Sequence, residues 1–176
     1  MKENLNIKVE APIYTVVADV TFAQVDAWFE HTRRDLKMDI IYPEDKTRKY
    51  PCIVWICGGA WAVMDKSAHM AYLSELARSG FVVASVEYRT TNEGKFPFQL
   101  MDVKAGIRYL KAHSERFHID VEHFGVMGES AGGYLTAMAA LVDDKSYDVG
   151  AFTEYSSKVQ AACPWYPPAD VTAFQY

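Results

Sequence analysis

Basic residues are in the minority in this sequence of 176 residues, and they are not clustered. Lys and Arg number 18 against 23 Asp and Glu, which gives a formal net charge of −5 at pH 7. Nucleic acids and anionic membrane surfaces are bound mainly through clustered Lys and Arg. The densest basic pair, Arg33 and Arg34, is flanked by Glu30 and Asp35. We therefore expect neither a nucleic acid nor a membrane as a partner.

Long apolar runs are also missing. No stretch approaches the roughly 20 apolar residues that cross a bilayer as a helix, and the opening residues MKENLNIKVE lack the apolar segment of a secretory signal. A cytoplasmic protein is the expectation, although a secreted protein that has lost its signal peptide would have the same sequence features.

Cysteine is scarce as well: Cys52, Cys57 and Cys163 are an odd number without CxxC spacing. The sequence thus predicts neither a disulfide framework nor a zinc site, and we expect no metal and no organic cofactor.

What remains is the composition of an ordinary globular protein, half hydrophobic and 23% charged. The length suits one domain with a sizeable core, and we assign residues 1–176 to a single domain. Strand and helix patterns alternate along it, with strands expected at 13–20, 36–42, 52–56, 81–86, 124–127 and 159–163 and helices at 67–79, from about 97, and after 130. This alternation predicts an α/β fold with a largely parallel, doubly wound sheet and helices on both faces.

The most informative segment is 128–133, GESAGG, between a predicted strand and a predicted helix. It fits G-x-S-x-G, in which a serine sits in a strained backbone conformation at a sharp strand-to-helix turn. The flanking glycines leave room for the chain to fold back, and the turn directs N–H groups and the positive end of a helix to one point. A glycine-rich turn with an incidental N-capping serine would also fit. The strand before and the helix after favour Ser130 as a nucleophile.

A second segment, 57–61 with the sequence CGGAW, directly follows the buried strand that ends at Ile56. Consecutive glycines at a strand end let backbone N–H groups approach a ligand with no Cβ in the way. Together with a serine turn, such a loop supplies half of an oxyanion hole. A plain loop at a strand exit is the alternative.

The two segments resemble the hormone-sensitive-lipase-like and feruloyl or acetyl-xylan esterase (BD-FAE-like) branches of the α/β-hydrolase superfamily. Those branches carry a His-Gly-Gly-Gly/Ala-Trp loop and a Gly-x-Ser-Ala-Gly-Gly turn. The resemblance runs from about Leu36 to the C-terminus. Further matching segments follow in the same order, at 87–89 (EYR), 96–97 (FP), 102–104 (DVK), 119–120 (ID) and 165–170 (WYPPAD).

The resemblance implies a role for each residue of the two motifs. Ser130 would be the nucleophile, and the backbone N–H groups of Gly59, Ala60 and Ala131 would form the oxyanion hole. Trp61 would either wall the acyl pocket or pack in the core. The implied activity is hydrolysis of acetyl, feruloyl or other short-chain esters, with a small-molecule or carbohydrate ester as the partner.

The sequence departs from the family at Cys57, which stands where the family has a histidine that orients the loop. A thiol braces the loop less well, so we expect loop disorder or lowered activity. A thiol at the end of a buried strand is usually a small hydrophobe, which disfavours Cys57 as a nucleophile.

The catalytic triad is also incomplete. In this fold the chain order is Ser, then Asp or Glu, then His, but all five histidines precede Ser130. Asp143, Asp144 and Asp148 belong to a helix end and the loop after it, and Asp170 matches a segment before the family's acid. We expect the chain alone to be inactive. It is either a C-terminally incomplete fragment of a longer esterase, which we favour, or a naturally shortened protein.

Two titratable residues near the motifs, His69 and Glu129, are not expected to take part in catalysis. His69 falls on the predicted helix over 67–79 and is expected at the surface, with a role as a substitute base as the second option. Glu129 is expected to brace the turn as a hydrogen-bond acceptor. The leading interpretation is a carboxylic ester hydrolase with an acyl-Ser130 intermediate. A peptidase or amidase of the same fold and a non-catalytic binding protein of that fold are the alternatives.

Overall fold

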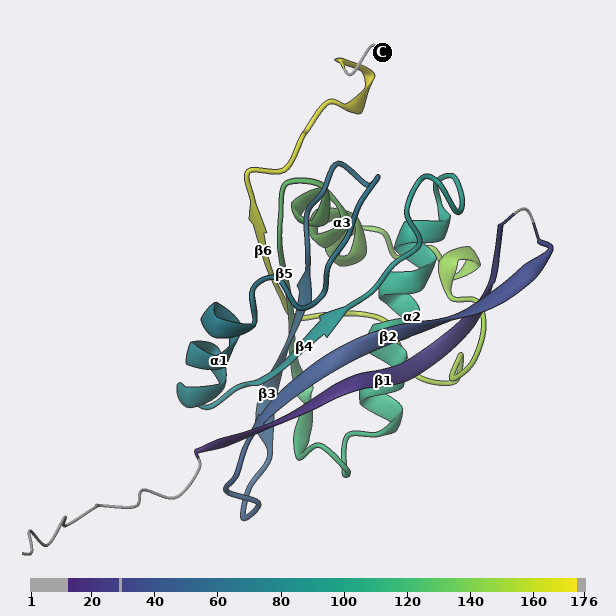
Figure 1. The fold of residues 1–176 in the computed structure, drawn as a ribbon. Coiled ribbons are helices and arrows are strands. Elements are labelled where there is room, and N and C mark those ends of the chain that lie inside the picture. The colour runs from purple at the N-terminus through teal and green to yellow at the C-terminus, as the bar shows by residue number, and fades with distance from the viewer. Residues whose placement is uncertain (1–12, 29, 174–176) are drawn as a thin grey trace, which may run out of the picture.

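The computed structural model describes residues 13–28 and 30–173 of the chain, arranged as Figure 1 shows. The described part forms one sheet in the order β1-β2-β4-β3-β5-β6. Its strands are β1 (Tyr14–Ala27), β2 (Thr32–Pro43), β3 (Tyr50–Ile56), β4 (Val82–Val86), β5 (Ile119–Glu129) and β6 (Ala161–Trp165). The helices are α1 (Met70–Arg78), α2 (Phe98–Ala112) and α3 (Ser130–Leu141), with short 3-10 turns η1 (Lys145–Tyr147) and η2 (Val171–Ala173).

The sheet is mixed. β4, β3, β5 and β6 are parallel neighbours, as predicted. β1 and β2 pair antiparallel, and β2 also joins β4 antiparallel. The connection over residues 28–31 is too short for a parallel crossover, so β1 and β2 form a long twisted ribbon at one edge. The prediction of a parallel sheet therefore holds for four of the six strands, and these include β5, which ends at the nucleophile motif.

The buried strands place alternate side chains in two separate cores. Val54 of β3 lies in the core that contains Ile107 of α2 and Leu135 of α3. Its neighbour Trp55 packs with Leu73 of α1. Because successive side chains of a strand point to opposite faces, α1 covers one face of the sheet, and α2 and α3 cover the other (Figure 1). The prediction of helices on both faces is confirmed.

The predicted elements are present, several with different bounds. The helix expected over 67–79 spans Met70–Arg78, and the Ser67 hydroxyl before it donates to Asp39, 2.9 Å away. The last strand is displaced from 159–163 to Ala161–Trp165 and includes Pro164. A proline is tolerated there because β6 is an edge strand, paired only with β5.

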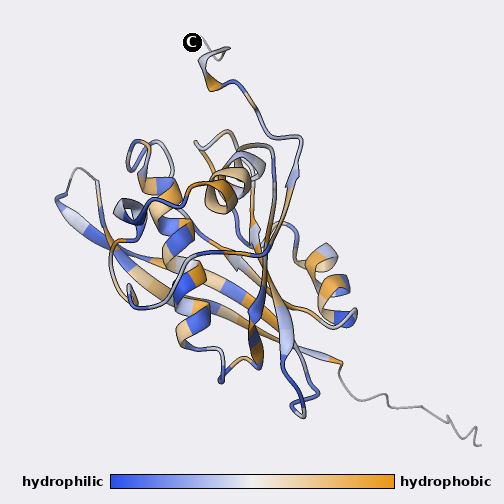
Figure 2. Cartoon of the chain, turned by 180° about the vertical axis from the view of Figure 1, so that it is seen from behind, coloured by the Kyte–Doolittle hydropathy of each residue, from blue (hydrophilic) through white to orange (hydrophobic). Residues whose placement is uncertain are grey.

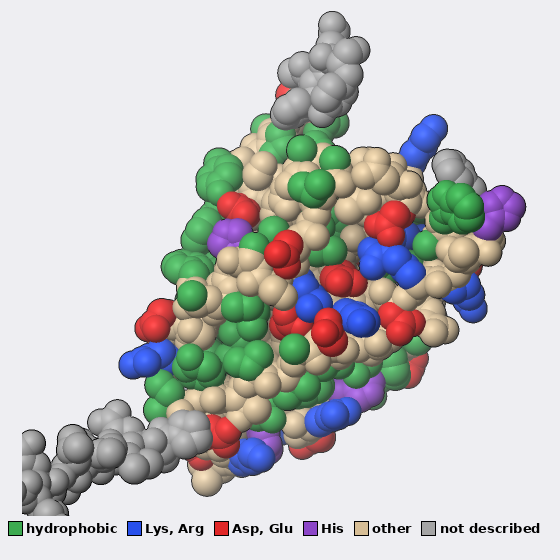
Figure 3. Space-filling model, in the orientation of Figure 1, with side chains coloured by type: hydrophobic (Ala, Val, Ile, Leu, Met, Phe, Trp, Pro, Cys, Tyr) green, Lys and Arg blue, Asp and Glu red, His purple; other side chains and the backbone are tan. Residues whose placement is uncertain are grey.

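The surface has a mixed character. In Figure 2, hydrophilic and hydrophobic residues alternate along α2, as expected for a helix packed on a sheet. Figure 3 shows acidic and basic side chains intermingled on one face, where Arg33, Arg34, Asp35, Lys37 and Glu87 surround a shallow hollow near β1 and β2. Within the described ranges, no helix has both the length and the apolar character that a membrane crossing requires.

Candidate active site

Ser130 lies at the junction where β5 ends at Glu129 and α3 begins. Its φ is +51°, in the left-handed region that serine rarely adopts. Glu129 before it is extended, with φ −116° and ψ 150°. The chain therefore turns sharply at Ser130, and the side chain is half-buried rather than enclosed in the core. A strained residue at a strand-to-helix junction is the geometry expected of a nucleophile turn.

The turn is tight because α3 begins against the end of β3. A Cβ on Gly132 would lie 2.0 Å from the backbone oxygen of Ile56 and 2.7 Å from that of Cys57. Only glycine fits at such a distance. This close approach holds the C-terminal ends of β3 and β5 together, and it brings the nucleophile turn next to the loop that follows β3.

The loop over 57–61 touches the turn directly. A Cβ on Gly58 would lie 2.9 Å from the backbone oxygen of Glu129 and 3.2 Å from the Cβ of Ser130. The structure thus brings together the two glycine motifs that the sequence places far apart. The catalytic roles of their residues stay predictions.

The three N–H groups expected to form an oxyanion hole belong to this contact. Ala131 lies in the first turn of α3, where N–H groups have no acceptor within the helix and the positive end of the helix dipole is found. In the described part of the chain, the N–H groups of Gly59 and Ala60 donate to no acceptor, and both residues have positive φ, +129° and +51°. These donors are free to bind an anionic oxygen.

Hydrogen bonds from neighbouring elements hold the loop at both ends. The hydroxyl of Tyr88 donates to the Cys57 carbonyl oxygen, 2.9 Å away. The backbone N–H of Thr91 donates to the Trp61 carbonyl oxygen, 2.8 Å away. Neither bond uses the Cys57 side chain, so the loop is braced by groups other than the residue that replaces the family's histidine.

A buried ion pair anchors the chain just after the loop. The Nζ of Lys66 lies 2.7 Å from the Oδ1 of Asp39 in β2. Burial disfavours the charged carboxylate, but its hydrogen bonds from Lys66, Asp19 and Ser67 and the charge of Lys66 outweigh burial, so the pKa of Asp39 lies below its ordinary value. No sequence pattern indicated this pair, because its members are brought together only by the sheet.

Trp61 lines a cavity of about 360 Å³ beside the nucleophile turn. The other lining residues are Thr91, Phe96, Gln99, Tyr134, Leu135 and Val171. The Trp61 and Tyr134 rings meet edge-on, with centroids 5.5 Å apart. Tyr134 lies one helical turn after Ser130 and so on the same side of α3. Sequence reasoning missed Tyr134, although its spacing from Ser130 on the predicted helix was an available signal.

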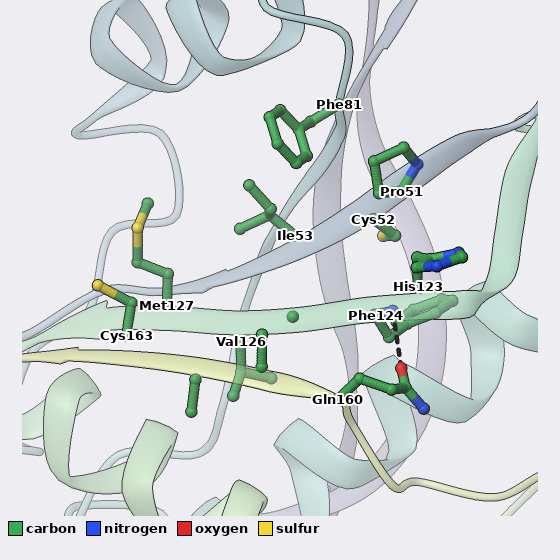
Figure 4. A pocket seen from close by; sticks show the side chains of 13 residues that line it. Pro51, Cys52, Ile53, Phe81, His123, Phe124, Val126, Met127, Gln160 and Cys163 are labelled. Carbon is green, nitrogen blue, oxygen red and sulfur yellow. Dashed lines mark hydrogen bonds between the residues drawn. The ribbon is translucent and has the colours of Figure 1, made fainter.

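A second apolar hollow, of about 290 Å³, lies over β3, β5 and β6. Figure 4 shows its lining, in which Ile53, Phe81, Met127 and Cys163 present carbon and sulfur. The polar side chain of Gln160 is turned to the backbone, where it accepts a hydrogen bond from the N–H of Phe124. None of its lining residues belongs to the loop over 57–61 or to α3, so we do not place the reaction here.

Glu129 belongs to a small polar cluster next to the nucleophile. One carboxylate oxygen accepts a hydrogen bond from the Tyr166 hydroxyl, so Glu129 is an acceptor at the turn, as expected. Its other oxygen lies 3.4 Å from the Nε2 of His69. His69 was expected at the surface, but it is half-buried, and its ring lies 5.2 Å from that of Trp55. His69 is therefore at the surface but only partly exposed, because its ring packs against Trp55.

Cys57 completes this cluster. Donor atoms of Cys57, His69 and Glu129 all lie within 4.8 Å of one another, which makes them the candidate metal ligands of the described residues. Burial raises the pKa of the Cys57 thiol; a backbone hydrogen bond from Asp65 opposes that rise, and the charge of Glu129 adds to it. A thiol with a raised pKa is not an activated nucleophile, in agreement with the expectation for Cys57.

A general base for Ser130 is not found in the described part of the chain. None of the described residues forms a hydrogen bond with the Ser130 hydroxyl. The histidines other than His69 lie away from Ser130. His113 binds the backbone oxygen of Tyr109 through Nδ1, 2.8 Å away. His123 is exposed and binds Asp120. The candidate site in the described residues thus consists of a strained serine turn and backbone N–H groups beside it.

This sheet, with a strained serine between β5 and α3 and a glycine-rich loop after β3, defines the chain as an α/β-hydrolase. The comparison with known families is more specific. A family model described as BD-FAE matches residues 38–176, and the chain belongs to that family.

Curated relatives are esterases. The probable carboxylic ester hydrolase LipM of Mycobacterium tuberculosis is 35% identical over 134 residues, which cover 74% of this chain and 31% of LipM. The chain spans about a third or less of the length of the curated relatives that it matches first.

Solved structures agree with this family. A truncated form of a carbohydrate esterase from gut microbiota has a TM-score of 0.73 at 30% identity, covering 89% of this chain and 57% of that one. An esterase of Thermogutta terrifontis with butyrate bound has a TM-score of 0.69 at 26% identity, covering 76% and 49%. The same esterase phosphonylated by cyclosarin has a TM-score of 0.71 at 25% identity, covering 86% and 56%.

Proposed function

We propose that this chain carries the nucleophile and the oxyanion-binding part of a carboxylic ester hydrolase that works through an acyl-Ser130 intermediate. The observation that supports it most is the strained Ser130, with φ +51°, held against the loop over 57–61. The esterase names of its relatives support the same reaction. The phosphonylated relative supports a covalent mechanism.

The proposed reaction follows from the groups around the turn. The Oγ of Ser130 attacks the ester carbonyl carbon while its proton passes to a base, and the carbonyl oxygen becomes an oxyanion. The N–H groups of Gly59, Ala60 and Ala131 donate to that oxyanion, and one such donor typically lowers the barrier by ~2.7–4 kcal/mol. The tetrahedral intermediate then collapses and releases the alcohol, which takes up the proton held by the base. Water then hydrolyses the acyl-serine and restores the hydroxyl.

The proposed reaction needs a general base that accepts the proton of the Ser130 hydroxyl. All five histidines of the sequence precede Ser130, and within the described ranges none of them bonds its hydroxyl. A serine hydroxyl without a base is a poor nucleophile at neutral pH. We therefore propose that the chain by itself hydrolyses esters at or near the background rate.

The proposed substrate is a short-chain or carbohydrate-linked ester, acetyl or feruloyl. The cavity between Trp61 of the loop and Tyr134 of α3 has aromatic walls and a volume of about 360 Å³, which is a size suited to a small acyl or aromatic group. The carbohydrate esterase and the butyrate-bound esterase among the similar structures support this class.

A fluorophosphonate probe tests the nucleophile, because it forms a covalent bond with an active serine that mass spectrometry locates. The expected result is slow labelling at Ser130, faster with added imidazole as a base, and none in Ser130→Ala. Ser74→Ala is the matched control, since the Ser74 hydroxyl is exposed and bonds only to its own helix, at Ala71. A folded wild-type chain that takes up no probe, with or without imidazole, would refute the proposal and favour a binding protein.

A further inference from the structure

Three side chains that the proposed reaction does not use meet beside the nucleophile turn. Cys57 follows β3, His69 directly precedes α1, and Glu129 ends β5. One donor atom of each lies within 4.8 Å of the other two. The three segments come together at the C-terminal ends of the parallel strands (Figure 1), so the cluster is held by backbone that the fold fixes.

The donor types and their spacing suit one particular kind of ion. Thiolate, imidazole and carboxylate are the ligands of Zn²⁺, whereas Mg²⁺ and Ca²⁺ prefer oxygen alone. Two ligand atoms bound to a tetrahedral zinc ion at ~2.0–2.2 Å lie about 3.4 Å from each other. The Nε2 of His69 and the Oε1 of Glu129 are 3.4 Å apart.

The hydrogen bonding of His69 is also incomplete. Its Nδ1 is buried and has no hydrogen-bond partner among the described residues. Its Nε2 is at the long limit for a hydrogen bond to Glu129. Coordination of an ion through Nε2 would replace this weak contact by a strong bond.

We propose that Cys57, His69 and Glu129 bind a zinc ion, which links the loop over 57–61, the start of α1 and the residue before the nucleophile. Tyr166, whose hydroxyl bonds the second oxygen of Glu129, orients that carboxylate. The fourth coordination position is taken by water. Zinc binding displaces the proton of the Cys57 thiol to solvent.

The sequence does not reveal this site, because its ligands are far apart along the chain and form no short motif. The expectation that no zinc site exists rested on the spacing of cysteines alone. Only one cysteine takes part here, and the other ligands are supplied by a helix start and a strand end.

The experiment is a titration of the full chain with Zn²⁺ against a chromogenic chelator, and with Co²⁺ as a spectroscopic probe. We expect one ion per chain and a near-ultraviolet thiolate-to-cobalt band. Loss of an outer partner of a metal site typically weakens binding 10–100-fold. Cys57→Ser, His69→Gln and Glu129→Gln, which each remove a ligand, should therefore weaken Zn²⁺ binding by about 100-fold or more, and Cys57→Ser should abolish the band.

Matched controls use residues of the same types outside the cluster. Cys163→Ser and His123→Gln change an exposed thiol and an exposed imidazole, and they should leave the affinity and the band unchanged. Circular dichroism establishes that each variant is folded. A wild-type chain that binds Zn²⁺ no more tightly than folded Cys57→Ser, or a cobalt band that disappears in Cys163→Ser, would overturn the proposal. The readout needs no ester hydrolysis, so it is separate from the test of Ser130.

Discussion

Replacing Gly132 by alanine tests whether the nucleophile turn is clamped against β3. The added Cβ would lie 2.0 Å from the carbonyl oxygen of Ile56 and 2.7 Å from that of Cys57. Both contacts are to backbone, so no change of rotamer relieves them. Either α3 or the end of β3 must move, and the contact between Ser130 and the loop over 57–61 opens.

The expected magnitude is the balance of two effects. Overpacking typically costs 1–3 kcal/mol, and we take about 3 kcal/mol because the obstacle is rigid. Alanine is favoured over glycine in a helix by about 1 kcal/mol. The net loss is about 2 kcal/mol of unfolding free energy. For a domain of this size, 1 kcal/mol corresponds to about 2–4 °C, so the Tm should fall by about 4–8 °C.

Urea and thermal unfolding followed by far-ultraviolet circular dichroism measure this loss. Gly125→Ala in β5 is the matched control, because its Cβ would meet nothing nearer than 3.7 Å. That variant should be unchanged or more stable by up to about 1 kcal/mol, through the unfolded state. The reasoning is refuted if Gly132→Ala is as stable as the wild type or if both variants lose the same free energy.

Two other predictions follow from buried groups. Asp39→Asn should lower the urea-unfolding free energy at pH 7 by about 2 kcal/mol, because Lys66 loses its buried charged partner and keeps only the ion pair with exposed Asp19, 3.0 Å away. The folded-state pKa of Asp39 is lowered, so its contribution is present at neutral pH and lost as the pH falls below about 4. The deficit of the variant should therefore shrink at pH 3, and a constant deficit would contradict this role. A thiol reagent should modify exposed Cys163 quickly and leave Cys52 and Cys57 unmodified, because both are buried and burial raises their pKa. Fast modification that persists in Cys163→Ser would contradict the burial of Cys52 and Cys57.

The sequence was most informative where the physical constraint is local. The apolar run over 52–56 predicts a strand buried on both faces, because such a strand has apolar side chains at successive positions. The glycines around Ser130 predict a sharp turn, because only glycine leaves room for the chain to reverse there. Both features were found where they were expected. The identity of the fold and the place of its nucleophile motif were therefore determined by residues that are neighbours along the chain.

The tertiary structure alone decided what meets across the sheet. Periodicity identifies a strand but not its partner, so the antiparallel pairing of β1 and β2 was not predicted. Asp39 meets Lys66 because β2 pairs with β4, where Ser85 lies opposite Asp39 and donates to the Lys66 carbonyl oxygen. Cys57, His69 and Glu129 belong to a loop, a helix start and a strand end, and only the parallel alignment of β3 and β5 places them side by side. Contacts of this kind depend on strand order and register, which chain-local patterns do not encode.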